Sequence, residues 1–191
     1  SALWQCIQPI QKLGPIYSCS MFYGNGTANL VKKSKWRDKN QGVITDIGSH
    51  LLDITNFWFN NKFQNYKLVQ SNKFENKSYD HAIIFGANKK SFLNLEMSLC
   101  SWKNSFKCDI YGERGSAHID SFCKWGTSYF FYKKRIFPSG KPMNYSSKVK
   151  MSDPTWLLEY KYFKKLILNN KKTDLKKDVM LFKILNSFKK K

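Results

Sequence analysis

Residues 42–53 have the sequence GVITDIGSHLLD, and this stretch organises the interpretation of the whole chain. Apolar residues recur in and beyond it at intervals of three or four, which places side chains on one face of an α-helix. Asp46 and His50 stand four positions apart beside this apolar stripe, so they project from one face of the predicted helix at the edge of the core. The stripe consists of Val43, Ile47, Leu51, Ile54 and Trp58.

A carboxylate one helical turn from an imidazole has two interpretations. The carboxylate can orient the ring and keep it suitable for proton transfer at neutral pH, as the oxidation of an alcohol requires. An Asp–His pair at this spacing is more often a capping or surface pair, so the spacing alone does not indicate catalysis. Polar groups at the edge of a core need partners in the protein or in a ligand, so Asp46 and His50 are candidates for a site.

The sequence before this helix predicts a short helix, a strand and a long loop. Residues 1–13 carry apolar side chains at helical spacing and are followed by a Gly-Pro pair that ends the helix. Residues 16–23 are apolar enough for a strand. The polar, lysine-rich residues 24–41 predict a long loop that carries Trp36 and Arg37, and long loops in compact domains are often functional.

The sequence after the helix predicts a sheet and then two more helices. Short runs rich in aromatic and β-branched residues alternate with turn signals, which favours antiparallel strands. Helices over residues 155–168 and 176–188 close the domain, and Asp153 and Pro154 lead into the first. The predicted strands are residues 66–74, 81–87, 92–102, 106–111, 117–120 and 127–137. The fold class is therefore α+β, an open, mostly antiparallel sheet of about six strands with helices on one face.

The charge of the chain raises the question of a nucleic-acid partner. The 191 residues carry a formal charge of +20, and clustered cations bind phosphate backbones. Only three of the 33 basic residues are arginine, however, and the lysines are spread along the whole sequence. Phosphate and base recognition favours the bidentate arginine side chain. We therefore expect a solvated, lysine-rich surface and no nucleic-acid partner.

Other classes of protein are disfavoured by the composition. No apolar run is long enough for a membrane span or a signal-peptide core, so we expect a soluble, cytoplasmic protein without a membrane partner. The five cysteines include no Cys-x-x-Cys pair, and no cluster has metal-ligand spacing, so neither disulfides nor a metal are expected. Gly24 and Gly26 begin a dinucleotide-binding fingerprint that lacks its third glycine.

The segment that contains Asp46 and His50, preceded by Trp36 and Arg37, is similar to the signature of the C-terminal domain of the Gfo/Idh/MocA oxidoreductases. This is the family of glucose-fructose oxidoreductase and inositol dehydrogenase. Residues 93–116 resemble its paired strands joined by a glycine turn, and residues starting at Asp153 resemble the start of its late helix. The resemblance covers nearly all of the chain, and Asp-x-Gly-x-His is its most specific element.

The resemblance implies an open sheet like the C-terminal domain of glyceraldehyde-3-phosphate dehydrogenase, with an uncovered face that often forms homo-oligomers. Residues 1–191 would then be one substrate-binding and oligomerisation domain. In the family an N-terminal Rossmann domain binds NAD or NADP and supplies a lysine from a Glu-Lys-Pro segment, and neither feature occurs in this sequence. The resemblance thus implies half of an NAD(P)-dependent enzyme acting on a sugar, polyol or sugar nucleotide, inactive alone.

The resemblance also implies roles for individual residues. His50 would be the acid/base group, and Asp46 would bind a substrate hydroxyl and steer the imidazole. Arg37 would pair with a carboxylate or phosphate on the substrate, and Trp36 would stack on a pyranose ring. These contacts have structural alternatives, since Trp36 and Trp102 can be core aromatics and Asn25 a turn residue that tolerates positive φ. The further substrate contacts are Tyr23, Asn25, Trp102 and Asn104.

Two other hypotheses remain open from the sequence. The chain can be a non-catalytic sheet domain that oligomerises or binds an anionic polymer through its lysines, which salt-dependent binding to RNA or an acidic polysaccharide would support. It can also be a degenerate relative that only oligomerises. The two histidines outside the candidate site, His81 and His118, fall in predicted strands and are expected on the sheet surface.

Overall fold

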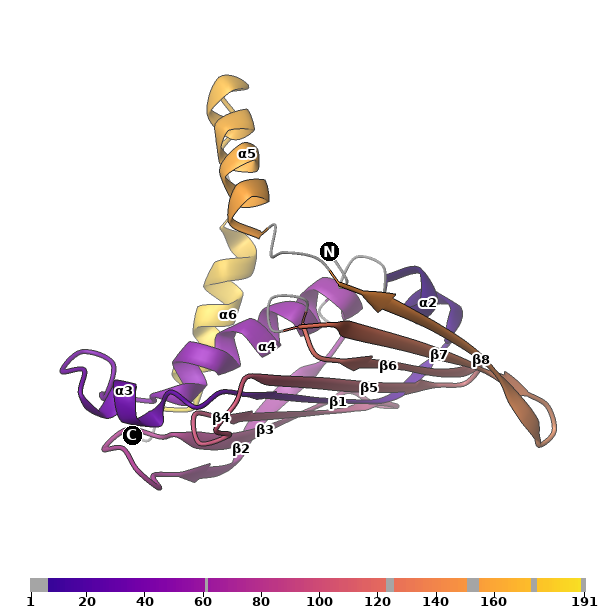
Figure 1. The fold of residues 1–191 in the computed structure, drawn as a ribbon, viewed down its shortest axis with the longest axis horizontal. Helices are drawn as coiled ribbons and strands as arrows, with labels where there is room; N and C mark the ends of the chain where they lie inside the picture. Colours follow the sequence, from indigo (N-terminus) through magenta and orange to yellow (C-terminus); the bar gives the residue numbers. More distant parts are fainter. Residues whose placement is uncertain (1–6, 61, 123–125, 151–154, 173–174, 190–191) are drawn as a thin grey trace.

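One open sheet of eight strands forms the body of the protein, in the order β2-β3-β4-β1-β5-β6-β7-β8 (Figure 1). The computed structural model describes residues 7–60, 62–122, 126–150, 155–172 and 175–189. β1 runs parallel to β4, and the other neighbouring strands are antiparallel. The strands are β1 (Ile16–Gly24), β2 (Gln64–Asn72), β3 (His81–Ala87), β4 (Phe92–Ser98), β5 (Ser105–Gly112), β6 (Gly115–Asp120), β7 (Ser128–Ile136) and β8 (Gly140–Val149).

Helix α4 (Val43–Phe59) lies across one face of the sheet and forms the centre of the core. Its buried side chains meet alternate residues of three central strands, among them Met21, Ile84 and Leu95. Gly48 lies where the helix approaches the sheet closely, since a Cβ at this position would meet Sδ of Met97 at 2.9 Å. The burial of one helix flank decides where the other flank points.

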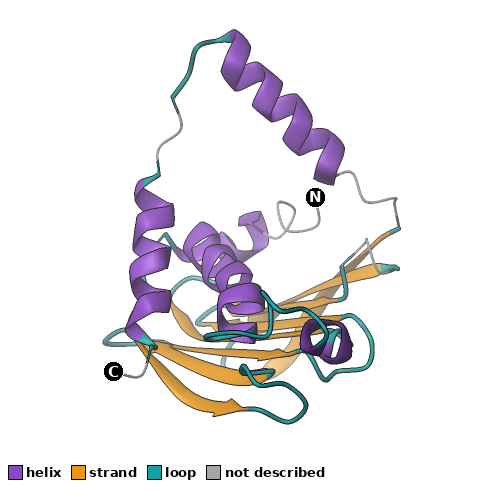
Figure 2. Ribbon diagram, turned by 90° about the vertical axis from the view of Figure 1, so that its left-hand side faces the viewer, coloured by secondary structure: helices purple, strands orange, loops and turns teal. Residues whose placement is uncertain are grey.

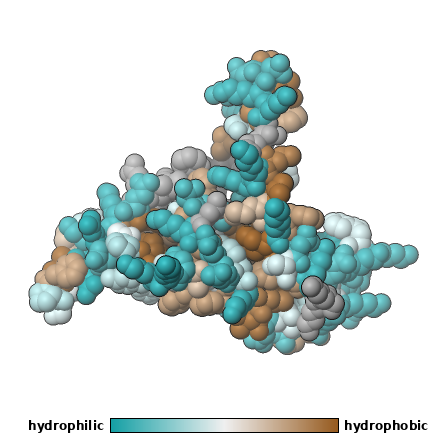
Figure 3. Space-filling view, turned by 180° about the vertical axis from the view of Figure 1, so that it is seen from behind, coloured by the Kyte–Doolittle hydropathy of each residue, from teal (hydrophilic) through white to brown (hydrophobic). Residues whose placement is uncertain are grey.

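The other described helices are α2 (Ile7–Lys12), α3 (Ala28–Lys32), α5 (Thr155–Leu168) and α6 (Lys176–Ser187). α6 packs against α4 and buries Leu185 in the core, with Phe188 buried just after it. α5 stands away from the sheet and has no buried residue among those described (Figure 1). Apolar surface is therefore visible along α5 in Figure 3. Its most regular apolar stripe is Trp156, Tyr160, Phe163 and Ile167.

The face of the sheet opposite α4 is not covered by any described helix (Figure 2). Polar side chains on this face pair across the strands. Nδ1 of His118 lies 2.5 Å from Oδ1 of Asp109, and its Nε2 lies 2.8 Å from Oγ of Ser116. Nε2 of His81 lies 3.3 Å from Oε1 of Glu96. Both histidines thus lie on the sheet surface, as the sequence predicts.

The fold class predicted from the sequence is confirmed. The helix predicted from Gly42 onward is α4, and the strand predicted over residues 81–87 has the observed bounds. The sheet has eight strands instead of about six, and it includes one parallel pair because β1 lies between β4 and β5. Asp153 and Pro154, with the first six residues of the predicted N-terminal helix, lie outside the described residues.

Four local features differ from the prediction. The sequence does not predict β8, because its side chains are nearly all exposed and lack apolar alternation; as an edge strand, β8 tolerates Pro142. The predicted loop over residues 24–41 contains the short helix α3. The strand predicted over residues 92–102 ends at Ser98, and Trp102 beyond it has a φ of 58° that no strand allows. The expectation that α5 closes the sheet is wrong, because only α6 packs on the core.

Replacing Leu51 with alanine tests the packing of α4. Leu51 is 0% exposed, so the change leaves a cavity and should lower the free energy of unfolding by about 2–5 kcal/mol. The same change at Leu30 of α3, which is 64% exposed, should cost less than about 0.5 kcal/mol. Urea unfolding followed by circular dichroism measures both, and equal costs at the two positions would contradict the placement of α4.

Candidate active site

The start of α4 is anchored so that Asp46 and His50 lie on its exposed flank. The backbone N–H of Val43 donates to the carbonyl of Tyr79 at 2.8 Å. Gly42 precedes the helix with a φ of 51°, and a Cβ there would collide with the same carbonyl, so glycine is required. The helix turns from this fixed point, which buries one flank on the sheet and leaves Asp46 and His50 exposed.

Tyr23, near the end of β1, lies beside His50. The ring centroids are 6.4 Å apart and the planes are tilted by 34°. The phenol ring also packs edge-on against Phe106 and Phe122, at centroid distances of 6.2 and 6.0 Å. Burial of the ring, and secondly the negative charge of Asp46, raise the pKa of Tyr23 above its ordinary value. The hydroxyl of Tyr23 therefore stays protonated at neutral pH.

Asp46 pairs with Arg37 from the preceding loop. Nη2 of Arg37 donates to Oδ2 of Asp46 at 2.9 Å, and the side chains are 33% and 43% exposed. Pairs this exposed contribute at most about 1 kcal/mol, so a ligand can replace either partner. The guanidinium carbon also lies 5.9 Å from the centre of the Trp36 ring. Among the described residues, no hydrogen bond joins the side chains of Asp46 and His50.

Asn25 closes the turn that follows β1. Its Oδ1 accepts hydrogen bonds from the amide and the hydroxyl of Thr27, at 3.1 and 2.7 Å. Its backbone N–H donates to the carbonyl of Ser98, and its carbonyl accepts from the N–H of Ser101, both at 2.9 Å. The end of β1 is therefore tied to the end of β4, and Asn25 lies in a turn, although it is not one of the described residues with a positive φ.

The two predicted tryptophans flank this end of the sheet. Trp102 is 92% exposed just beyond β4, and Trp36 is 78% exposed in the loop before α4. Asn104, before β5, is also exposed. Neither indole belongs to the core, so the structural alternative for the tryptophans is wrong. Both rings are accessible to a ligand.

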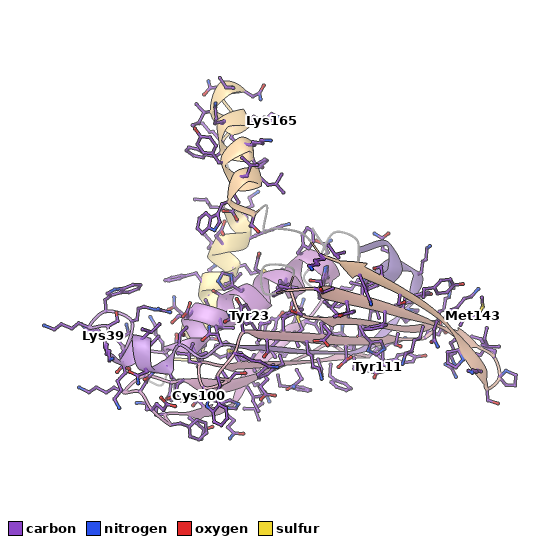
Figure 4. The ribbon with its side chains drawn as sticks, in the orientation of Figure 1. Tyr23, Lys39, Cys100, Tyr111, Met143 and Lys165 are labelled. Carbon is purple, nitrogen blue, oxygen red and sulfur yellow. The ribbon has the colours of Figure 1, made fainter. Side chains whose placement is uncertain are left out.

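A hollow of about 420 Å³ opens beside Asp46. Its wall combines the loop before α4, the first turn of α4 and the last turns of α6, and it includes Trp36, Arg37 and Asp46. Tyr23 and His50, whose rings are neighbours, do not line it. Figure 4 labels Lys39, which lines the hollow, and Tyr23 beside α4. The α6 side of the wall consists of Phe182, Leu185, Asn186 and Lys189.

Sequence reasoning missed two parts of this hollow. The first is the α6 side, because the pattern over residues 176–188 predicts a helix without saying where it docks. The second is Gln41, which is only 4% exposed although its side chain is polar. A polar residue just before an apolar helix gives no signal that it will be buried, so its burial is seen only in the folded structure.

The described residues do not build a dinucleotide site. Such a site needs a glycine-rich turn between a strand and a helix of a parallel sheet. Gly24 and Gly26 follow β1, but a Cβ at Gly26 would meet the carbonyl of Trp102 at 2.7 Å, so that turn is covered. No described group of three or more His, Cys, Asp or Glu residues could hold a metal ion. Within the described ranges, none of the helices combines the length and apolar character needed to span a bilayer.

Comparison with known proteins gives a family match. Residues 9–176 match the family described as "Oxidoreductase family, C-terminal alpha/beta domain". A search of curated proteins found no match.

Solved structures share the fold. A putative NADPH-dependent oxidoreductase from Desulfitobacterium hafniense superimposes with a TM-score of 0.71 at 15% identity, over 96% of this chain and 55% of that one. UDP-N-acetylglucosamine 3-dehydrogenase from Acidithiobacillus ferrooxidans gives a TM-score of 0.66 at 18% identity, over 97% and 56%. Levoglucosan dehydrogenase in complex with NADH and L-sorbose gives 0.61 at 14% identity, over 75% and 43%. The chain thus spans about half the length of these proteins.

Asp46→Asn tests the electrostatic link between Asp46 and Tyr23. Removing the negative charge should lower the pKa of Tyr23, because a nearby anion disfavours the phenolate. The pKa should remain above its ordinary value, since burial is the larger cause. Asp53→Asn removes the same charge from the same helix and should leave the pKa of Tyr23 unchanged. Titration of the tyrosine ring carbons by NMR measures both, and equal shifts would contradict the assigned contact.

Proposed function

Because the chain belongs to the Gfo/Idh/MocA oxidoreductase family and corresponds to its C-terminal α/β domain, we propose that it is the substrate-binding half of an NAD(P)-dependent oxidoreductase. The substrate would be a sugar, polyol or sugar nucleotide that reacts at a hydroxyl or keto group. Two structural relatives support this class, since one is a UDP-N-acetylglucosamine dehydrogenase and the other a levoglucosan dehydrogenase bound to NADH and L-sorbose. Residues 1–191 would act as one substrate-binding and oligomerisation domain.

The proposal rests on the position of His50. Its imidazole is exposed at the edge of the core, beside the ring of Tyr23 and one turn after Asp46. An exposed imidazole can take the proton of a substrate hydroxyl during oxidation and return it during reduction. The neutral hydroxyl of Tyr23 can hold the same substrate oxygen, and Asp46 can accept a hydrogen bond from a neighbouring hydroxyl.

The remaining predicted residues would shape the substrate site. The exposed rings of Trp36 and Trp102 offer flat apolar faces of the kind on which a sugar ring packs. Asn104 can hydrogen-bond to hydroxyl groups of the substrate. Asn25 would contact the substrate as well, in addition to holding the turn after β1. Arg37 can bind a carboxylate or phosphate of the substrate, because its pair with Asp46 is partly exposed to solvent.

NAD or NADP, when bound, would supply the hydride chemistry. The described residues do not fit a dinucleotide, so we assign its binding to a Rossmann domain outside them. This chain would bind and orient the carbohydrate and move the proton at Nε2 or Nδ1 of His50. His50 is exposed in this domain, so a cofactor held by the Rossmann domain could reach a substrate bound beside it.

His50→Gln tests the proposed proton transfer. In the protein joined to its Rossmann domain, the substitution should lower kcat by at least about 100-fold while KM changes little, because glutamine cannot exchange the proton. His81→Gln, the same change on the opposite face of the sheet, should retain nearly full activity. Steady-state kinetics with pyranose substrates measures both. Turnover by the His50→Gln protein at the normal rate would remove His50 from the mechanism.

The uncovered sheet face would join copies of the chain into a homo-oligomer. Its polar groups are already paired across the strands, as in the Ser116, His118 and Asp109 network, so burial would leave few of them unsatisfied. Large side chains stand beside them, with Tyr111 49% exposed and Phe131 39% exposed. Aromatic residues of this kind are enriched in the centres of interfaces.

Phe131→Lys tests this interface. A charge placed at the centre of a buried contact should dissociate the oligomer, and light scattering coupled to size-exclusion chromatography should show a monomer. Met143→Lys adds the same charge at an apolar side chain that is 48% exposed on the helix side of β8, and it should leave the mass unchanged. An unchanged mass for Phe131→Lys would exclude this face.

A further inference from the structure

The hollow beside Asp46 has an excess of positive charge. Three of its lining residues are cationic, Arg37, Lys39 and Lys189, and Asp46 is the single acidic residue among the described ones that line it. The cations come from the loop before α4 and from the second residue after α6, so they face the space from two sides. An anion in this space would be surrounded by charge instead of lying on a flat basic surface.

The side chain of Arg37 retains donors for a ligand. A guanidinium group has five N–H donors in a fixed planar fork. The hydrogen bond to Asp46 uses only Nη2. The fork suits a phosphoryl or carboxylate group that accepts two parallel hydrogen bonds. Arg37 can therefore hold such a group and Asp46 at the same time.

Gln41 is an independent sign of a polar ligand. Its side chain lines the hollow and is 4% exposed. Neither Oε1 nor Nε2 has a hydrogen-bond partner within the described residues. Burying an amide without partners costs free energy, and buried polar groups are usually satisfied by the protein, by water or by a ligand. A ligand oxygen, directly or through a water, would satisfy this amide.

The hollow also offers surfaces for a ring. Trp36 and Phe182 line it and are 78% and 63% exposed. Gly42 and Thr45 place the first turn of α4 in the wall, where the helix dipole favours negative charge. The combination of aromatic faces with cations suits a ligand that has both a ring and an anionic group.

We propose that this hollow binds the phosphoryl group of the substrate, so that the substrate is a phosphorylated sugar or a nucleoside-diphosphate sugar and not a neutral one. The identification of the ligand as substrate rests on the proposed function. Asp46 lines the hollow four residues before His50, about 6 Å along the helix axis. A phosphoryl group held beside Asp46 therefore leaves the attached sugar ring within reach of His50.

Calorimetric titration of the protein with three probes tests the proposal. Uridine diphosphate and glucose 1-phosphate should bind. Tighter binding of uridine diphosphate would indicate a nucleotide sugar, and tighter binding of glucose 1-phosphate a simple sugar phosphate. Methyl glucoside should not bind in the same concentration range. The triple variant Arg37→Gln, Lys39→Gln and Lys189→Gln should weaken the binding of the phosphorylated probes by at least about tenfold. Its matched control, Lys67→Gln, Lys133→Gln and Lys141→Gln, removes the same charge from strands away from the hollow and should change the affinity by less than about twofold.

Two further variants separate this proposal from the proposed function. His50→Gln should bind the phosphorylated probes normally, so loss of turnover without loss of binding concerns His50 alone. Gln41→Leu should raise the melting temperature, because it removes an unsatisfied buried amide, and should weaken the binding of uridine diphosphate.

Three results would overturn the phosphoryl site. Equal weakening by the two triple variants would show attraction by net charge only. Equal binding of methyl glucoside would remove the requirement for an anion. Binding of single-stranded RNA that is tighter than that of uridine diphosphate and insensitive to the Arg37, Lys39 and Lys189 changes would assign the cations to a different class of ligand.

Discussion

The close contact between α4 and the sheet is the constraint on which the rest of the structure depends. Gly48 lets the helix approach Met97, and the carbonyl of Tyr79 fixes the first N–H of the helix. With one flank buried, the other flank has a fixed direction, and the residues on it cannot rotate away without exposing the core. The same apolar packing that stabilises the domain thus positions Asp46 and His50.

Asp46 stands between two environments that divide the candidate site. On one side, Tyr23 and His50 form an aromatic, solvent-facing surface suited to proton transfer. On the other side, Arg37 belongs to a cationic hollow completed by α6. Because Asp46 is bonded to Arg37 and its charge acts on Tyr23, an anionic group bound at Arg37 would be linked through this carboxylate to the residues around His50.

Local patterns in the sequence were sufficient to predict most helices and strands, but not how these elements pack together. The stripe beside Asp46 predicts α4 because a buried helix flank imposes its own spacing. The edge strand β8 has no such signal, since both of its faces are solvated. The insertion of β1 between β4 and β5 and the docking of α6 depend on contacts between distant residues. For that reason the candidate residues on α4 could be named from the sequence, whereas Gln41 and Lys189 could not.

The central place of β1 has a consequence for how the chain is made. β1 pairs with β4 on one edge and with β5 on the other, and both partners follow it in the sequence. β1 therefore leaves the ribosome before either partner, and both of its edges are paired only after Gly112 has emerged. Pairing between strands that are distant in the sequence slows folding and leaves intermediates that are prone to aggregation. A chaperone that covers unpaired strands would therefore raise the folding yield of this domain more than that of a helical bundle.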